Sequence, residues 1–193
     1  MGHADTFREE LMKQHYSDII RHVLMFAVIF IGFLVWIHAS NLKYPQAKDG
    51  VLDLTSWNLN TDGRITLSGE WEFDWGEFLT WEDYKDGLRP GSLFATVPQI
   101  WNRYQIDGRN LPGFGYATYH LKVKVPDTKT ILGLRINTAS TSYKFYIDDR
   151  LVGQNGETGT SAETSKPQYY PVTTTFAPPS KEFDIIVHVS NFT

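Results

Sequence analysis

The stretch S-G-E-W-E-F-D-W-G, residues 68–76, alternates acidic and aromatic residues more regularly than any other part of the chain. Successive side chains of an extended strand point to opposite faces, so this period of two predicts a β-strand with Trp71, Phe73 and Trp75 on one face. Three large rings on one face predict a substantial contribution to a hydrophobic core. The three acidic residues between them share the other face.

The acidic face of this strand admits two interpretations. Glycosidases use paired carboxylates, and the spacing of neighbouring acids along a strand does not exclude such a pair. An acid–base pair, however, needs two carboxyl groups in different environments, and neighbours in one exposed row share similar surroundings. We therefore interpret Glu70, Glu72 and Asp74 as a solvated strand face and expect no catalytic residues and no enzyme activity.

On both sides of this strand the chain continues in short alternating segments separated by turn-forming residues. In residues 116–125 the apolar side chains recur at every second position, from Ala117 to Val125, and the intervening side chains are expected to point outward. A short helix is predicted within residues 78–86, capped by Thr80. Further strands are predicted at residues 51–57, 94–97, 131–136, 143–147, 168–176 and 182–190. The strand count and turn spacing predict an all-β sandwich or jelly roll.

Two segments between the predicted strands are candidates for ligand binding, because loops on a rigid scaffold commonly carry function. Residues 101–115, the aromatic loop, contain rings, Arg103 and glycines; residues 155–167, the hydroxyl loop, contain no apolar residue larger than Ala before Pro167. If the loops meet, they form an aromatic floor with a charged and hydroxyl-bearing rim, which suits a neutral or cationic polyol. The candidate ligand-binding residues are Trp101, Arg103, Tyr104, Tyr116, Asn155, Glu157, Thr160 and Glu163.

Each loop also has a simpler interpretation. Trp101 can fold back as a plug of the sandwich, which we favour for this ring, and the hydroxyl loop can be a mobile connector. The loops can also lie at opposite ends of the sandwich, where they only close it. The distance between the loops therefore decides whether one site is formed.

The N-terminal part of the chain contains a run of apolar residues, V-L-M-F-A-V-I-F-I-G-F-L-V-W-I, at positions 23–37. A helix that is apolar on every side belongs in a core or a bilayer. The length of the run suits either an uncleaved anchor or a cleaved signal segment. We expect a helical cytoplasmic tail at residues 1–22, a transmembrane anchor or signal segment at residues 23–39, a linker at residues 40–49 and an extracytoplasmic β domain at residues 50–193. The excess of basic residues before the run predicts this orientation.

Composition narrows the remaining choices. The formal net charge of −4 and the lack of a Lys/Arg cluster argue against nucleic-acid binding. The chain has no Cys, and its six His are scattered without metal-ligand spacing, so no metal site and no cofactor are expected. It contains no HExxH, P-loop, G-x-S-x-G or Rossmann glycine pattern.

Several segments, taken in order, resemble a galactose-binding-like jelly roll. They are L-S-G-E-W-E-F at residues 67–73, V-P-x-x-W at residues 97–101, G-Y-A-T-Y-H-L-K-V-K-V-P at residues 115–126 and S-Y-K-F-Y-I-D-D-R-L-V-G-Q-N-G at residues 142–156. The first half of this pattern is shared with the sugar-binding domain of family 2 glycosidases.

Two further segments, G-E-T-G-T-S-A-E-T-S-K-P-Q at residues 156–168 and H-V-S-N-F at residues 188–192, carry a more specific resemblance. They are similar to the extracellular domain of bacterial seven-transmembrane receptors with diverse intracellular signalling modules. The resemblance implies a carbohydrate sensor placed before seven helices and an output module. This sequence stops at Thr193 without them, so we expect a fragment or a divided receptor.

The main functional hypothesis is therefore a membrane-tethered sensor for a small polar ligand, with a saccharide as the expected class, located at the cell membrane. The alternative is a non-catalytic sugar-binding accessory domain of a secreted glycoside hydrolase. The expected partners are this ligand and the membrane, no nucleic acid is expected, and the sequence leaves a homodimer open.

Overall fold

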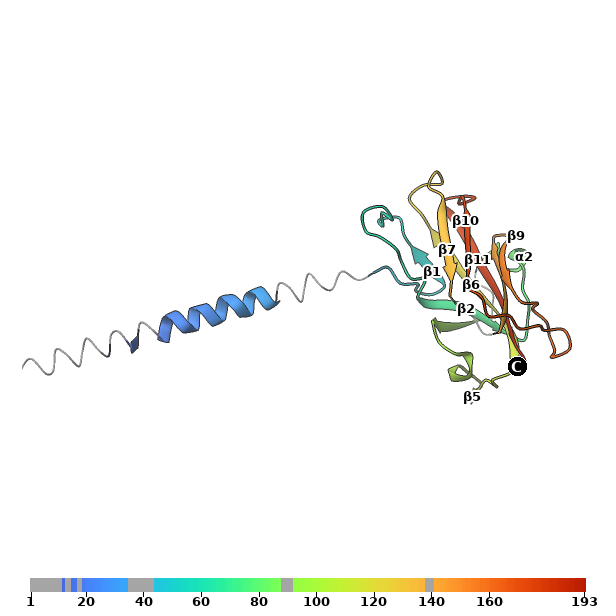
Figure 1. Cartoon of the computed structure of the whole chain (residues 1–193), viewed down its shortest axis with the longest axis horizontal. Helices are drawn as coiled ribbons and strands as arrows, with labels where there is room; N and C mark the ends of the chain where they lie inside the picture. Colours follow the sequence, from blue (N-terminus) through green and yellow to red (C-terminus); the bar gives the residue numbers. More distant parts are fainter. Residues whose placement is uncertain (1–11, 13–14, 17–18, 35–43, 88–91, 138–140) are drawn as a thin grey trace, which may run out of the picture. The chain divides into compact units, whose positions relative to one another are not determined.

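The computed structural model describes residue 12 and residues 15–16, 19–34, 44–87, 92–137 and 141–193 (Figure 1). The chain divides into two compact units, Met1–Tyr44 and Pro45–Thr193, which are treated separately below. Most of the predicted cytoplasmic tail and the end of the predicted anchor, residues 35–39, lie outside the described residues. The predicted linker is described only from Tyr44 onward.

In the first unit, residues 19–34 are helical. The side chains of this helix are exposed, including Phe26 and Val28 at 66% and 70%. No helix within the described ranges combines the length and apolar character that crossing a bilayer requires. A helix over the apolar run is thus observed, and its role as a membrane anchor stays a prediction.

The second unit is an all-β sandwich, as the strand pattern predicted. Its large sheet consists, in spatial order, of β3 (Leu93–Val97), β2 (Gly69–Trp75), β6 (Gly115–Lys124), β11 (Glu182–Asn191), β8 (Ser142–Ile147) and β9 (Arg150–Asn155). These strands pair antiparallel, and β1 (Val51–Asp53) adds a short parallel pairing at the end of β6. A smaller sheet pairs β7 (Leu132–Ile136) with β10 (Val172–Phe176). The predicted strands are thus observed, although the first one ends at Asp53 rather than at residue 57 and the one predicted from residue 168 begins only at Val172.

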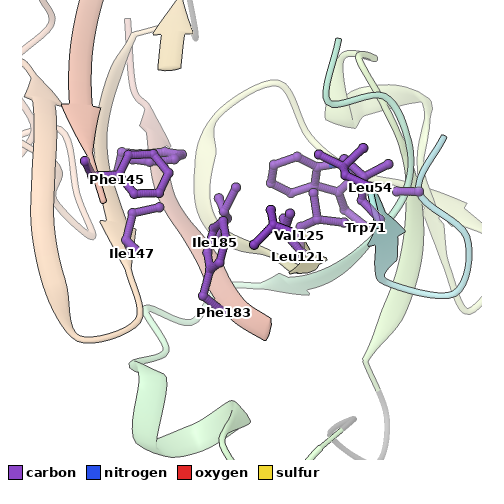
Figure 2. Packing of buried hydrophobic residues seen from close by; sticks show 12 residues of the cluster. Leu54, Trp71, Leu121, Val125, Phe145, Ile147, Phe183 and Ile185 are labelled. Atoms are coloured by element: carbon purple, nitrogen blue, oxygen red, sulfur yellow. The ribbon is translucent and has the colours of Figure 1, made fainter. Parts of the chain in front are cut away.

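The main core lies between one face of the large sheet and the smaller sheet. Trp71, Leu121, Phe145 and Ile185 come from four strands of the large sheet and are each at most 5% exposed (Figure 2). Leu132, Leu134 and Phe176 of the smaller sheet pack against the same cluster. Burying large apolar side chains is the dominant favourable contribution to folding. The prediction that the rings of residues 68–76 face a core is confirmed.

The opposite face of the large sheet is also covered, which corrects the prediction of a solvated acidic face. Residues 78–84, here called the strap, cross this face and include α2 (Trp81–Tyr84). The helix begins after Thr80, as predicted, because the Asp83 carboxylate accepts hydrogen bonds from the Thr80 N–H and hydroxyl. Leu79 and Tyr84 of the strap pack with Ile186 of β11.

The strap changes the surroundings of the three acids of β2. Glu70 stays exposed, Glu72 is 0% exposed, and Asp74 is half-buried and accepts hydrogen bonds from Tyr84 and Ser92. The expectation of a shared, solvated environment was therefore wrong. A period of two identifies the two faces of a strand, but it does not say which distant segment covers the polar face.

Candidate functional site

The two candidate loops reach the same end of the large sheet. The aromatic loop leads into the start of β6, and the hydroxyl loop follows the end of β9 (Figure 1). Both loops contact consecutive residues of β11: the Gly159 N–H donates to Ser190 Oγ at 3.2 Å, and Asn191 Nδ2 donates to the Gly113 carbonyl at 2.9 Å. The structure thus has both loops at one end of the sheet rather than at opposite ends, and the two loops attach to side chains that point to opposite faces of β11.

Three serine hydroxyl groups fix the hydroxyl loop to the sheet. Ser190 Oγ lies 2.7 Å from Ser142 Oγ and 3.0 Å from Ser165 Oγ, and Ser142 and Ser165 are 3.2 Å apart. All three residues are buried, so the hydroxyls satisfy one another in place of water. This triangle joins β8, β11 and the loop, which argues against the interpretation of the loop as an unattached connector.

The hydroxyl loop is also tied across its own base. The backbones of Glu157 and Lys166 exchange two hydrogen bonds of 2.9 Å, and their side chains form an exposed ion pair at 2.9 Å. Inside the loop, Gly159 packs so closely that an added Cβ would lie 2.3 Å from the Thr164 carbonyl carbon. The loop is therefore a compact structure whose outer surface carries hydroxyls.

The aromatic loop is anchored by its two predicted rings. Trp101 packs edge-on against Trp75 with ring centroids 5.2 Å apart, and its Nε1 donates to the Gly113 carbonyl at 3.1 Å. The Tyr104 hydroxyl donates to the Thr96 carbonyl at 2.8 Å. Between these anchors and Gly115, β4 (Gln105–Ile106) and β5 (Arg109–Asn110) form a small hairpin that the sequence analysis did not predict.

The predicted ligand-binding residues separate into buried and accessible ones. Trp101, Tyr104 and Asn155 are at most 9% exposed. Trp101 thus occupies the plug position that we favoured, and Asn155 Nδ2 donates to the Gln168 carbonyl at 2.8 Å. Tyr116 is half-buried beside Phe78. The predicted residues whose side chains remain accessible are Arg103, Glu157, Thr160 and Glu163.

Three exposed rings at this end were missed. Phe114, Tyr169 and Tyr170 are 61%, 60% and 67% exposed. The tyrosine pair lies between Gln168 and Val172. Gln168 accepts hydrogen bonds from Asn155 and Gly156 of the hydroxyl loop, and Val172 packs on the cluster containing Trp101. The signal was the adjacent Tyr-Tyr pair in a polar stretch, which we had assigned to a strand that begins only at Val172.

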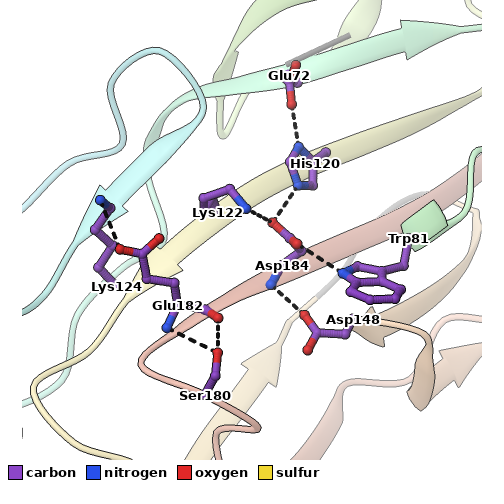
Figure 3. A network of polar contacts seen from close by, with 9 residues as sticks. All are labelled: Glu72, Trp81, His120, Lys122, Lys124, Asp148, Ser180, Glu182 and Asp184. Carbon is purple, nitrogen blue, oxygen red and sulfur yellow. Dashed lines mark hydrogen bonds and ion pairs between the residues drawn. The ribbon is translucent and has the colours of Figure 1, made fainter. Parts of the chain in front are cut away.

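A second group of polar residues lies beneath the strap (Figure 3). His120 is wedged between two carboxylates: its Nδ1 forms a short contact with Glu72 Oε2, and its Nε2 lies 3.0 Å from Asp184 Oδ1. Asp184 Oδ1 also accepts from Lys122 Nζ at 2.9 Å, and Asp184 Oδ2 accepts from Trp81 Nε1 at 3.1 Å. We call Glu72, His120, Lys122 and Asp184 the charged quartet.

The electrostatics of the charged quartet follow from its hydrogen bonds. Burial disfavours the imidazolium of His120, but the hydrogen bonds with Asp184 and Glu72 outweigh it and raise the pKa of His120 above its usual value. Burial likewise disfavours the Asp184 carboxylate, but the hydrogen bonds from His120 and Lys122 outweigh it and lower the pKa of Asp184. With His120 protonated, the quartet thus joins the cationic side chains of His120 and Lys122 to the carboxyl groups of Glu72 and Asp184.

The charged quartet contains acid–base groups, but they are closed to a substrate in this structure. Glu72, His120 and Asp184 are 0%, 2% and 4% exposed, and the Tyr84 ring stacks on the imidazole at a centroid distance of 4.0 Å. A general acid or base must come within hydrogen-bond reach of the reacting group. The accessible loop end is therefore the better candidate for contact with a ligand. Within the described residues, no group of three or more His, Asp or Glu has the arrangement of a metal site.

Comparisons with known proteins found no matching family model and no matching curated protein. The solved structures that resemble the chain include three β-glucuronidases, and each match covers 65% of this chain. The Faecalibacterium prausnitzii enzyme has 17% identity and a TM-score of 0.48, and the match covers 20% of that chain. The enzyme from an uncultured Clostridium sp. has 16% identity, a TM-score of 0.47 and 22% coverage. The Dictyoglomus thermophilum enzyme has 21% identity and a TM-score of 0.46, and the match covers 19% of that chain. The chain thus spans about a fifth of each enzyme, and no functional conclusion rests on the match.

Proposed function

We propose that Pro45–Thr193 is a non-catalytic binding domain for a small polar ligand, with saccharides as the ligand class. The observation that carries the proposal is the attachment of both candidate loops to Ser190 and Asn191, the last two residues of the same central strand. In the proposed site, this end of the sheet offers a ligand the hydroxyls, carboxylates and guanidinium of the two loops together with exposed rings. Sugars are bound by this combination, because a ring face stacks on the apolar side of the sugar while polar groups bond its hydroxyls.

The roles within the proposed site differ from those expected from the sequence. Trp101 and Tyr104 hold the aromatic loop in place, and the exposed rings Phe114, Tyr169 and Tyr170 supply the stacking surface. Arg103 and Glu163 fix the orientation of the ligand, because a charge-assisted hydrogen bond is about twice as strong as a neutral one.

Saccharide titration of the full chain in mild detergent tests this proposal. For a sugar that binds, Arg103→Ala and Tyr170→Ala should each weaken the Kd by about tenfold, the equivalent of about 1.4 kcal/mol. The matched control is Lys129→Ala, which removes an exposed cation beyond the last residue of β6, at the other end of the sheet. Its Kd should stay within about twofold of wild type.

Two outcomes would contradict the proposed site. Binding of no saccharide in a broad panel would remove the ligand class. Equal affinities of Arg103→Ala, Tyr170→Ala and Lys129→Ala would place any bound sugar elsewhere on the domain.

We further propose that this domain is the extracytoplasmic sensor of a bacterial membrane receptor, tethered by residues 23–39. Support comes from the helix over residues 19–34, whose apolar side chains are exposed on every side. An exposed apolar surface of this kind needs a lipid or protein cover. Ligand closure of the loops would then shift an equilibrium that the anchor transmits to membrane-embedded partners.

Protease accessibility tests the location. In intact spheroplasts that express the chain, added protease should degrade residues 49–193 and spare the N-terminal tail, since the β domain is expected outside the cytoplasmic membrane. Immunoblots against a tag at each end give the measurement. A β domain that stays intact until detergent is added would exclude an extracytoplasmic location.

A further inference from the structure

The strap is attached to the sheet mainly through groups whose charge depends on pH. Trp81 Nε1 donates to Asp184 at 3.1 Å, the Tyr84 hydroxyl donates to Asp74 at 2.7 Å, and His188 Nε2 donates to the Leu79 carbonyl at 2.6 Å. Thr118 adds two neutral bonds: its Oγ1 accepts from the Leu79 N–H and donates to the Glu77 carbonyl. A change of charge beneath the strap therefore acts directly on its attachment.

We propose that the strap is a pH-sensitive cover, which stays closed while His120 carries two ring protons and is released when His120 loses one of them. This inference concerns the face of the sheet beneath the strap, and it does not depend on the proposed ligand or on the location of the domain.

The geometry of His120 carries the first step. Both ring nitrogens face a carboxylate oxygen, so both contacts are favourable only when both nitrogens bear a hydrogen. The neutral imidazole has one N–H, and its other nitrogen would then present a lone pair to a carboxylate. Deprotonation thus turns one of the two contacts from attractive to repulsive.

The charge balance carries the second step. With His120 protonated, the charged quartet is neutral, because His120 and Lys122 offset Glu72 and Asp184. Loss of the proton leaves one net negative charge beneath the strap, where Glu72 Oε1 is already buried with no hydrogen-bond partner. An uncompensated buried charge is strongly unfavourable, and exposing it to water is the simplest relief.

Other titratable and charged groups surround His120 on every element packed against it. They are Glu72 and Asp74 on β2, Lys122 on β6, Asp184 and His188 on β11, Asp148 in the turn before β9, and Tyr84 on the strap.

His188 and Asp148 do not provide a comparable switch as the pH rises above neutrality. Burial lowers the pKa of His188, so this residue is already neutral in the folded domain. Burial raises the pKa of Asp148, while its acceptance of the Asp184 N–H opposes that shift. Burial opposes the charged form of His120, but the hydrogen bonds with Asp184 and Glu72 raise its pKa above the usual value.

The contacts of the strap explain why it would open before the sandwich does. Tyr84 stacks on the imidazole, and a ring face attracts a cation more strongly than a neutral ring. The bond from Trp81 ends on Asp184, one of the two carboxylates that His120 contacts. The main core lies on the opposite face of the sheet and contains none of the quartet residues.

Because the chain contains no Cys, an introduced cysteine supplies the only thiol in a test of accessibility beneath the strap. Ile186→Cys places a thiol beneath the strap, where Ile186 is 1% exposed, and Ile185→Cys places one in the main core, where Ile185 is 2% exposed. Each full-length variant, in mild detergent, is to be treated with an uncharged thiol reagent at pH values from about 6 to about 10. This range includes the usual pKa of His. The reaction rate of each protein thiol is divided by that of a free cysteine peptide at the same pH, which removes the effect of thiol ionisation.

Above the pKa of His120, the protection of the Ile186→Cys thiol should fall by up to about tenfold per pH unit, while the Ile185→Cys thiol stays protected. Adding Glu72→Gln to Ile186→Cys removes one carboxylate, so a neutral His120 leaves no net charge. The protection of the thiol in this double variant should then change by no more than about twofold across the pH range.

Three results would overturn the proposal: protection of the Ile186→Cys thiol that does not vary with pH, an equal fall for both thiols, or an unchanged fall after Glu72→Gln. A measurement without substitutions gives the same decision if a variant does not fold. Hydrogen–deuterium exchange of wild type, corrected for the intrinsic rate, should accelerate over residues 78–84 and not over β8 as the pH rises. Exchange that rises equally in both segments would likewise exclude a separate cover.

Discussion

Trp71→Ala is expected to lower the free energy of unfolding of the β sandwich by about 3–5 kcal/mol, the usual cost of truncating a buried Trp. The ring is 5% exposed and packs in the main core with residues of both sheets (Figure 2). Because close-packed neighbours relax only in part, the substitution leaves a cavity as well as removing apolar burial. Urea unfolding followed by the β-sheet circular dichroism signal measures the loss.

Two matched variants isolate the cause. Trp71→Phe keeps a ring and removes an indole N–H that is buried without a hydrogen-bond partner, so its cost should be well below that of the Ala variant. Ile131→Ala removes an apolar side chain that is 70% exposed, and its effect should stay within about 0.5 kcal/mol. A loss below about 1 kcal/mol for Trp71→Ala would mean that this ring does not support the core.

The sequence predicts most of the strands of this domain because their pattern is local. In β2 and β6 the apolar side chains recur every second residue, so each strand identifies its own core face without any knowledge of its partners. The short helix at α2 was predicted for the same reason, since Thr80 and Asp83 cap it within one turn.

The surroundings of Glu72 could not be predicted in this way. Glu72 contacts His120 of the neighbouring strand β6, and Tyr84 of the strap covers His120. The pattern of a single strand contains no information on either neighbour. A clue was present in residues 78–84, where Phe78, Leu79, Trp81 and Tyr84 are too apolar for an exposed connection. They needed a surface to cover, and the polar face of β2 and β6 is that surface.

The candidate site shows the same division. The composition of the two loops was visible in the sequence, and so were most of the side chains now found exposed. Their position at one end of the sheet depends on contacts with Ser190 and Asn191, and the order β6–β11–β8–β9 behind these contacts is not encoded in any one segment. The missed ring pair Tyr169–Tyr170 follows from this, because its relevance appears only once both loops are placed.

Asp184→Ala is expected to destabilise the domain by about 3–5 kcal/mol, the cost of removing one partner from a buried ionic network. The substitution leaves His120, Lys122 and the Trp81 N–H without their shared acceptor. Glu182→Ala is the matched control on the same strand. Glu182 pairs with Lys124 directly across the sheet, as Asp184 does with Lys122, but the two Glu182–Lys124 side chains are 57% and 35% exposed. Its loss should therefore be below about 1 kcal/mol.

The pH dependence of this difference provides a stricter test, because the two key groups titrate in opposite directions. The pKa of Asp184 is lowered from 3.8, so its stabilising effect is complete above that pH and is lost as the pH falls through the folded-state pKa. The pKa of His120 is raised from 6.5, so its effect is complete below that pH and is lost as the pH rises through the folded-state pKa. The gap between wild type and Asp184→Ala should be widest between these two values and should narrow on both sides. A gap that widens in acid, or equal losses for Asp184→Ala and Glu182→Ala, would show that the charged quartet does not stabilise the fold, because stability must follow the protonation of the groups that create it.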